Sequence, residues 1–185
     1  GNEDQERVSK TRGILEVRLL LPGGQKAAVF AVHLPSGGAP GYLRQQAVAY
    51  LAHLKSELPS DVLPIVGGDF NINAGEEKQN GYIAKDLAST WAVSQFIGCN
   101  DCKGSYYYHT KREWSFFDML LFPKQMTTAG GFNGWQVDPA SIRLANHSPY
   151  QVNRWGSPAR FDSARHAEGV SDHWPLYAEI FRPAP

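Results

Sequence analysis

Cysteine, unbalanced charge and long hydrophobic runs are all scarce in this sequence. Its 185 residues include only two cysteines, and eighteen basic residues balance eighteen acidic ones for a formal net charge of zero. Zero charge argues against a protein that holds nucleic acid through many nonspecific phosphate contacts, but not against a nuclease that touches a few phosphates. No apolar run approaches the ~20 residues that cross a bilayer as a helix, so a membrane-spanning helix is not expected.

The two cysteines, Cys99 and Cys102, form a single Cys-x-x-Cys motif in a loop rich in Gly and Asn. One such motif lacks the second ligand pair of a structural zinc site, although His109 offers a third ligand. Free thiols are the favoured interpretation, ahead of a local disulfide, which would indicate a periplasmic or secreted protein. No typical secretory leader is present, which leaves the compartment of a soluble protein open between the cytoplasm and a secreted or periplasmic location.

Length and composition indicate one domain. The chain is long enough to bury a sizeable core. Its content of 42% hydrophobic and 19% charged residues is ordinary for a soluble globular protein. We expect a single domain over residues 1–185, in which residues 1–11 form a flexible polar leader.

Hydrophobic periodicity predicts a hairpin, a helix and a strand in the first part of the chain. Residues 14–21 and 26–34 flank a Pro-Gly-Gly turn, which is typical of an antiparallel hairpin. Over residues 41–58 apolar side chains recur at three- and four-residue steps before a proline, which predicts an amphipathic helix. Residues 63–66 are a short apolar run typical of a buried strand. This order favours a helix packed on one face of a sheet.

The rest of the chain is less regular. Its predicted elements are a polar, mobile loop over residues 75–80, a helix over 83–96, a strand pair over 105–108 and 114–122, long loops over 127–169 and a final strand over 174–181. Loops of such length in a compact domain are usually functional or disordered.

Two polar motifs stand beside hydrophobic strands. Asp69 and Asn71 follow the strand at residues 63–66 and a pair of glycines, and their two-residue spacing makes them point the same way. Asp172 and His173 stand just before the final strand. A carboxylate suits a hard divalent cation, and an imidazole that titrates near neutrality can remove a proton from water. Together the motifs predict metal-assisted hydrolysis at one edge of a sheet.

Four stretches with polar residues beside strands follow one another in a fixed order. They are Val32-His33-Leu34-Pro35-Ser36, Gly68-Asp69-Phe70-Asn71, Phe117-Asp118-Met119-Leu120-Leu121 and Ser171-Asp172-His173-Trp174-Pro175. Together they resemble the endonuclease/exonuclease/phosphatase superfamily, which includes pancreatic deoxyribonuclease, abasic-site endonucleases, bacterial sphingomyelinases and inositol polyphosphate phosphatases. The resemblance implies an α/β fold (α+β in some schemes), a deoxyribonuclease-like β-sandwich flanked by helices in a four-layer architecture.

The resemblance also implies an incomplete domain. Family members usually have an Asn-bearing strand and a strand ending in a metal-binding Glu ahead of the segment that resembles residues 12–17. Only eleven residues precede that segment here, and Glu3 and Glu6 lie in the polar leader. We therefore expect the carboxyl-terminal part of the family domain, with an incomplete metal site and an uncovered apolar face that drives self-association.

The resemblance assigns roles to five catalytic residues. His173 is the general base that deprotonates the attacking water, and Asp118 accepts from one of its ring nitrogens. Asp118 lies in an apolar strand, where a carboxylate is costly unless it is paired. Asn71 holds the scissile phosphate or the nucleophile, Asp69 orients the water or contacts a cation, and His33 protonates the leaving group.

The implied cofactor is Mg²⁺ or Mn²⁺, with Asp172 and Asp69 as oxygen ligands. The implied activity is a metal-dependent phosphoester hydrolase, more a phosphodiesterase or nuclease than a phosphomonoesterase. The inositol phosphatase branch has a Trp-x-Asp-Arg pattern where residues 116–119 read Phe-Phe-Asp-Met. The substrate would be a nucleic acid, a phospholipid headgroup or a small phosphodiester. The alternative is a noncatalytic fragment or binding module, because the Glu ligand is absent.

Overall fold

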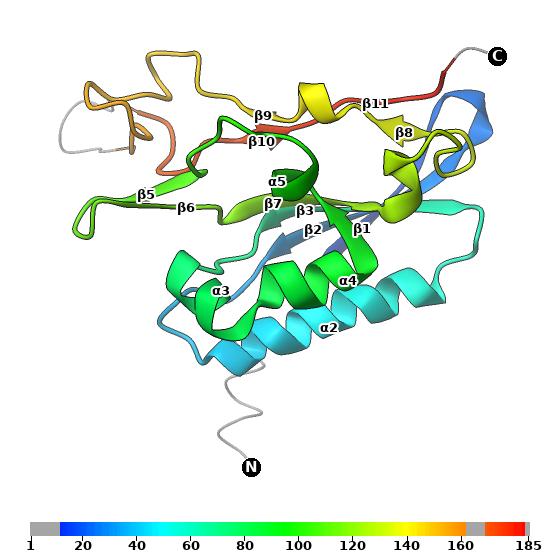
Figure 1. The fold of residues 1–185 in the computed structure, drawn as a ribbon, viewed down its shortest axis with the longest axis horizontal. Helices are drawn as coiled ribbons and strands as arrows, with labels where there is room; N and C mark the ends of the chain where they lie inside the picture. The colour runs from blue at the N-terminus through cyan, green and yellow to red at the C-terminus, as the bar shows by residue number, and fades with distance from the viewer. Residues whose placement is uncertain (1–11, 162–168, 184–185) are drawn as a thin grey trace.

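The computed structural model describes residues 12–161 and 169–183, which fold around one mixed β-sheet (Figure 1). The leader predicted over residues 1–11 lies outside the described residues. Five strands form the sheet in the order β1-β2-β3-β7-β4. β2 and β3 are parallel, and the other neighbours are antiparallel. The strands are β1 (Leu15–Leu20), β2 (Lys26–His33), β3 (Val62–Asp69), β7 (Asp118–Pro123) and β4 (Trp91–Val93).

The first two strands form the predicted hairpin, with a 3-10 turn, η1 (Pro22–Gly24), between them. Gly23 and Gly24 have φ angles of 76° and 82°. Glycine adopts this left-handed conformation without the steric cost that other residues meet. The Pro-Gly-Gly sequence therefore fixes the position of the turn, and the hairpin prediction is confirmed.

Helix α2 (Gly41–Glu57) connects the parallel strands β2 and β3 and confirms the predicted amphipathic helix. Its residues Leu43, Val48 and Leu51 are buried. The last two join the main core, which also contains Phe30 of β2 and Val66 of β3. A crossover between parallel strands packs its helix onto the sheet, and Figure 1 shows α2 along one face of it. None of the helices in the described ranges is long and apolar enough to cross a membrane.

The segment predicted as a polar loop over residues 75–80 is instead a helix, α3 (Ala74–Asn80). Asn73 caps it, because the Asn73 Oδ1 accepts the backbone N–H of Glu76 at 2.9 Å. Gly81 ends the helix in the left-handed conformation, with φ of 73°. The helix buries no side chain. Its capping residues, and not an apolar stripe, therefore explain why it forms.

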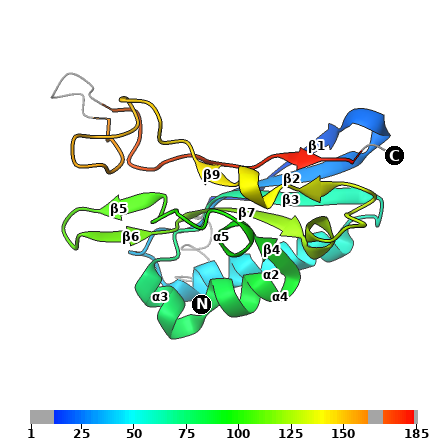
Figure 2. The same cartoon turned by 45° about the horizontal axis from the view of Figure 1, so that its top comes forward.

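The helix predicted over residues 83–96 is present only in part, because a strand interrupts it. That stretch contains a π-helix, η2 (Tyr82–Leu87), and the short elements α4 (Ala88–Thr90), β4 and α5 (Ser94–Ile97). Trp91 begins β4 opposite Pro123 of β7 and is buried, whereas Phe96 is 55% exposed. Helical spacing of the apolar residues misled the prediction, because pairing with a distant strand overrides local periodicity. The helical elements up to α4 lie with α2 on one face of the sheet (Figure 2).

Short strand pairs cover the other face of the sheet (Figure 2). β8 (Gln136–Val137) pairs with β11 (Ile180–Phe181), and β9 (Arg143–Leu144) pairs with β10 (Leu176–Tyr177). The final strand predicted over residues 174–181 is therefore two strands. Two 3-10 turns, η3 (Lys124–Thr127) and η4 (Pro139–Ser141), flank β8.

A second apolar core fills the space between this layer and the sheet. Leu63 and Phe122 contribute from the sheet, and Trp135, Val137 and Ile142 contribute from the covering layer. A sheet with a core on each face and helices outside one of them agrees with the α/β fold flanked by helices that the resemblance implied. Of the four layers expected, the described residues form the helices, the five-stranded sheet and the layer of short strand pairs. The long loops predicted over residues 127–169 contain the short elements β8, η4 and β9. Residues 162–168 lie outside the described part of the chain.

A separate hairpin of β5 (Tyr106–Tyr108) and β6 (Glu113–Ser115) extends beyond the sheet (Figure 1). The strand predicted over residues 114–122 is divided at Phe116 and Phe117, because β6 pairs with β5 whereas β7 pairs with β3 and β4. The chain thus changes partner just before Asp118. This change places Asp118 at the first position of a central strand.

Cys99 and Cys102 form a disulfide in the loop between α5 and β5, with their Cα atoms 5.2 Å apart. The preference for free thiols is therefore corrected in favour of the local disulfide. Cys99 has a φ of 59°, and its carbonyl accepts the N–H of Cys102 at 2.9 Å, so the two cysteines lie at the two ends of one tight turn.

Candidate active site

Three neighbouring strands bring polar residues side by side at one edge of the sheet. His33 of β2 is opposite Asp69 of β3 in the parallel register. Asp69 is in turn opposite Asp118 of β7 in the antiparallel register. Because hydrogen-bonded strands are ~4.8 Å apart, the three side chains lie within reach of one ligand.

Gly68 explains the close packing of the strands at this edge. Its φ is 140°, and a Cβ at this position would lie 2.0 Å from the carbonyl oxygen of Val32. No other residue fits there without separating β2 from β3. The glycine next to Asp69 is therefore required by the backbone approach of two strands.

Asn71 turns back onto Asp69. Its φ of 52° lies in the left-handed region, which Asn tolerates better than most residues. Its backbone N–H donates to Asp69 Oδ1 at 2.8 Å, and its amide donates to Asp69 Oδ2 at 2.9 Å and to the Leu34 carbonyl at 3.0 Å. Both amide hydrogens thus have acceptors within the protein. The geometry favours Asn71 as a residue that fixes Asp69 and the loop after β2.

Asp118 and His173 form a close pair. The Nδ1 of His173 lies 2.7 Å from the Oδ2 of Asp118, although the two residues are 55 positions apart in the sequence. His173 reaches this place because it forms an isolated β-bridge with Tyr106. With Nδ1–H donated to the carboxylate, Nε2 is left as a proton acceptor. The pairing predicted between these two residues is present.

Asp172 lies beside this pair but is engaged elsewhere. Its Oδ2 accepts from Nη2 of Arg160 at 3.0 Å, and both side chains are about half exposed. The hydroxyl of Ser171 is bonded to the backbone, because its Oγ accepts the N–H of His173 at 3.0 Å. Arg160 belongs to none of the motifs, and the residues next to it in the sequence did not indicate its contact with Asp172.

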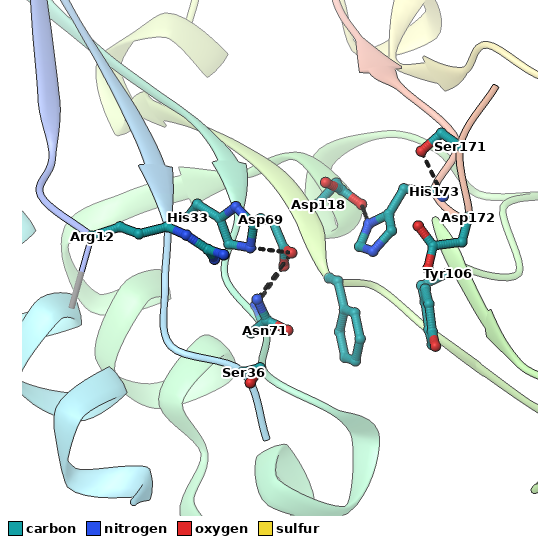
Figure 3. A pocket seen from close by; sticks show the side chains of 11 residues that line it. Arg12, His33, Ser36, Asp69, Asn71, Tyr106, Asp118, Ser171, Asp172 and His173 are labelled. Atoms are coloured by element: carbon teal, nitrogen blue, oxygen red, sulfur yellow. Dashed lines mark hydrogen bonds and ion pairs between the residues drawn. The ribbon is translucent and has the colours of Figure 1, made fainter. Parts of the chain in front are cut away.

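The six predicted site residues line one cavity of about 530 Å³ (Figure 3). They are His33, Asp69, Asn71, Asp118, Asp172 and His173. The other lining residues are Arg12, Ser36, Tyr106, Phe117 and Ser171. Figure 3 shows Arg12 and His33 on one side of Asp69, and His173, Asp172 and Tyr106 on the other.

Sequence reasoning did not select Arg12, Ser36 or Phe117 as site residues. Ser36 and Phe117 belong to two of the four family-like stretches, so their motif positions were an available signal. Arg12 had no such signal, because it precedes the first strand.

Burial and charge shift the pKa values of two site residues in the same direction. Burial lowers the pKa of His173, but the hydrogen bond and charge of Asp118 and the charges of Asp69 and Asp172 outweigh it, so the net pKa is raised. The pKa of Asp69 is raised mainly by burial, against the hydrogen bond from the Asn71 backbone. The site therefore holds its protons more firmly than the same groups do in water.

Tyr106 and Phe117 form an aromatic wall of the cavity. Their rings are stacked, with centroids 4.9 Å apart and planes inclined by 18°. The Tyr106 ring also lies 5.0 Å from the imidazole of His173. Burial raises the pKa of Tyr106, so its hydroxyl stays protonated and can donate a hydrogen bond.

No protein-family model and no curated protein matches this sequence. Solved structures do share its fold. An endonuclease/exonuclease/phosphatase protein from Beutenbergia cavernae matches over 98% of this chain, with a TM-score of 0.56 and 17% identity. The chain has the endonuclease/exonuclease/phosphatase fold. TDP2 of D. rerio, solved with a single-strand DNA product, matches over 91% of the chain with a TM-score of 0.60 and 18% identity. A mannosyl-6-phosphatase from Bacteroides thetaiotaomicron matches over 86%, with a TM-score of 0.55 and 16% identity.

The chain spans only part of the proteins that share the endonuclease/exonuclease/phosphatase fold. It covers 61% of the TDP2 structure, 52% of the phosphatase and 42% of the Beutenbergia cavernae protein. At these identities the similarity establishes the fold, and the chemistry has to be inferred from the cavity.

A divalent cation is the cofactor implied by this fold and by the carboxylates of the cavity. Among residues 12–161 and 169–183, no three His, Cys, Asp or Glu side chains gather as metal ligands. Both Asp69 oxygens accept from Asn71, and one Asp172 oxygen accepts from Arg160. The described residues therefore do not by themselves fit a bound cation, and we assign no chemical step to one.

Proposed function

We propose that this protein hydrolyses phosphoesters, phosphodiesters in preference to phosphomonoesters, with His173 as the base that activates water. The supporting observation is the 2.7 Å contact between His173 Nδ1 and Asp118 Oδ2 beside the cavity. A carboxylate that fixes the tautomer of a histidine is a recurring arrangement in general-base catalysis. The fold adds support, because proteins that share it include a phosphatase and one solved with a DNA product.

In the proposed reaction, Nε2 of His173 takes a proton from water while the water oxygen bonds to phosphorus. The bond between phosphorus and the leaving oxygen breaks on the opposite side, as an in-line displacement requires. We propose His33 as the group that protonates that oxygen, because Asp69 separates it from Asp118 in the row across the sheet. Asp118 stabilises the imidazolium that forms on His173.

The aromatic wall supports a substrate with a flat group next to the phosphate. Stacked Tyr106 and Phe117 line the cavity that His173 faces. Nucleobases stack on such rings in a sequence-tolerant way. We therefore place nucleic acid ahead of phospholipid headgroups and small phosphodiesters as the substrate class.

A binding module without catalysis is the second candidate, and the contact between Asp172 and Arg160 favours it. The carboxylate expected to hold a cation already has a cationic partner at 3.0 Å. On this alternative the cavity binds a phosphate-bearing ligand and leaves it intact.

Turnover of bis-p-nitrophenyl phosphate, with p-nitrophenyl phosphate as the monoester, tests the proposal. We expect the diester to be preferred, and His173→Ala to abolish its turnover while the protein stays folded. His53→Ala is the matched control, because His53 is exposed on α2 and should leave turnover unchanged. Turnover of the His173→Ala protein at the wild-type rate would refute the proposal, and ligand binding without turnover would favour the binding module.

We propose that the carboxylates of the cavity, as oxygen donors, bind Mg²⁺ or Mn²⁺ only weakly in this chain, because their oxygens already accept hydrogen bonds from Asn71 and Arg160. Calorimetric titration should give weak binding to this chain, with a Kd on the order of 10⁻³ M or weaker, because few charged ligands are free. Asp172→Ala should weaken the binding further. Micromolar binding would show that other residues complete the site.

A further inference from the structure

Ser105 lies at the junction of the segments that carry the Asp118–His173 pair. Its side chain is fully buried, with 0% exposure. Its Oγ accepts the backbone N–H groups of Phe117 at 3.2 Å and of Asp118 at 3.0 Å. Its carbonyl accepts the N–H of Trp174 at 2.8 Å. One residue therefore contacts the backbone at Asp118 and again next to His173.

Ser105 is itself held in place. Its N–H donates to the carbonyl of Ser115 at 3.0 Å. The preceding Gly104 has a φ of 152°, and a Cβ there would lie 2.7 Å from that same carbonyl oxygen. Only glycine permits this approach. On the following side, Tyr106 forms the β-bridge with His173. The junction is thus anchored to the end of β6 and to the residue that bears the imidazole.

We infer that Ser105 is a positioning residue, whose hydroxyl keeps the Asp118 carboxylate at hydrogen-bonding distance from His173. The chain leaves the β5–β6 hairpin and enters the central sheet at Asp118. Ser105 Oγ holds the two N–H groups at that point of entry. Without the hydroxyl, two backbone donors lose their acceptor in a buried place, and the start of β7 shifts to find others.

Ser94, the first residue of α5, provides a matched control because it hydrogen-bonds to the same strand, β7. It is also fully buried, and its Oγ accepts the backbone N–H of Leu120 at 3.1 Å. Leu120 lies two residues beyond Asp118 in β7. Ser94→Ala therefore removes a hydrogen bond of the same kind from the same strand, at a place that does not contact the pair.

The experiment compares Ser105→Ala, Ser94→Ala and Ser105→Thr with the wild type. One readout is diester kinetics, which rests on the proposed function. The other is the downfield proton NMR signal of His173 Nδ1–H, assigned by its absence from His173→Ala, which needs no activity. For Ser105→Ala we expect kcat to fall roughly 10- to 100-fold with KM changed less than about twofold, as a displaced catalytic group requires.

The NMR signal should be lost or moved upfield in Ser105→Ala and kept in Ser94→Ala, and Ser105→Thr should restore both readouts because it retains the hydroxyl. If the wild type turns over no diester, the proposed function fails, and the NMR comparison alone decides on Ser105. Wild-type kcat and signal in Ser105→Ala would overturn the inference. Three other outcomes would overturn it too: equal losses in Ser94→Ala, no recovery in Ser105→Thr, or a Ser105→Ala protein that does not fold. In each case the hydroxyl would stabilise the fold without positioning Asp118 against His173.

Discussion

Among single residues, Asp118 has the most direct control over His173. Asp118→Asn keeps the size of the side chain, but its amide can donate to Nδ1 and so favours the wrong tautomer for a base at Nε2. We expect kcat for diester hydrolysis to fall roughly 10³- to 10⁴-fold with little change in KM. Steady-state kinetics of the wild type and the variant give kcat and KM separately. A defect confined to KM would make Asp118 a substrate-binding residue instead.

The raised pKa of His173 predicts the pH dependence of the reaction. A general base acts when it is unprotonated, so activity should increase as pH rises through this pKa. The acid limb of the kcat/KM profile should therefore lie above the ordinary value of 6.5. Asp69→Asn removes one of the charges that raise the pKa, and the limb should move to lower pH. A wild-type limb at or below the ordinary value would contradict the assignment.

At the scale of elements, Arg44 of α2 ties together the segments that follow β2 and β3. Its guanidinium donates to the carboxylate of Glu76 in α3 at 2.7 to 3.0 Å. It also donates to the carbonyls of Pro35 and Ser36 at 2.9 and 2.8 Å. The Arg44 residue is only 3% exposed. The loop after β2, whose Ser36 lines the cavity, and helix α3 are therefore fixed to the same buried charge.

Breaking this contact should destabilise the protein strongly. Arg44→Met leaves the Glu76 carboxylate nearly buried and without its cation, and we expect a loss of about 3–5 kcal/mol in the free energy of unfolding. Arg44→Met combined with Glu76→Leu should lose less, because no unpaired charge remains. Urea denaturation compares the two proteins. Equal losses would show that the unpaired Glu76 carboxylate costs little, and that Arg44 acts through its other hydrogen bonds.

At the scale of the whole molecule, β1 is an open edge of the sheet. Among the described residues it pairs with β2 alone, and all six of its residues are exposed. Its large apolar side chains Leu15, Val17, Leu19 and Leu20 are 42% to 74% exposed. An exposed apolar edge strand favours pairing with another chain.

We therefore expect this chain to associate with itself through β1. Light scattering should give a mass above that of a monomer, and the mass should rise with concentration. Val17→Lys with Leu19→Lys should return the mass to that of a monomer, because charges on an edge strand oppose pairing. Tyr50→Lys, at an exposed position of α2, is the control and should change nothing. A wild type that stays monomeric at every concentration would contradict this expectation.

The sequence by itself determined the features that depend on neighbouring residues. The Pro-Gly-Gly turn, the helical period of residues 41–58 and the apolar run before Asp69 are local patterns, and the structure contains the elements they predict. Four motif stretches, placed by resemblance, also predicted which polar residues would meet at the cavity. Local geometry carries such information because backbone conformation and side-chain direction are set within a few residues.

Only the tertiary structure decided the features that depend on distant partners. Trp91 begins a strand and not a helical turn because β7 pairs with it. The contact of Arg160 with Asp172 and the place of Ser105 between Asp118 and Trp174 had no signal in the sequence. These contacts join segments that only packing brings together, and local propensity carries no information about such partners.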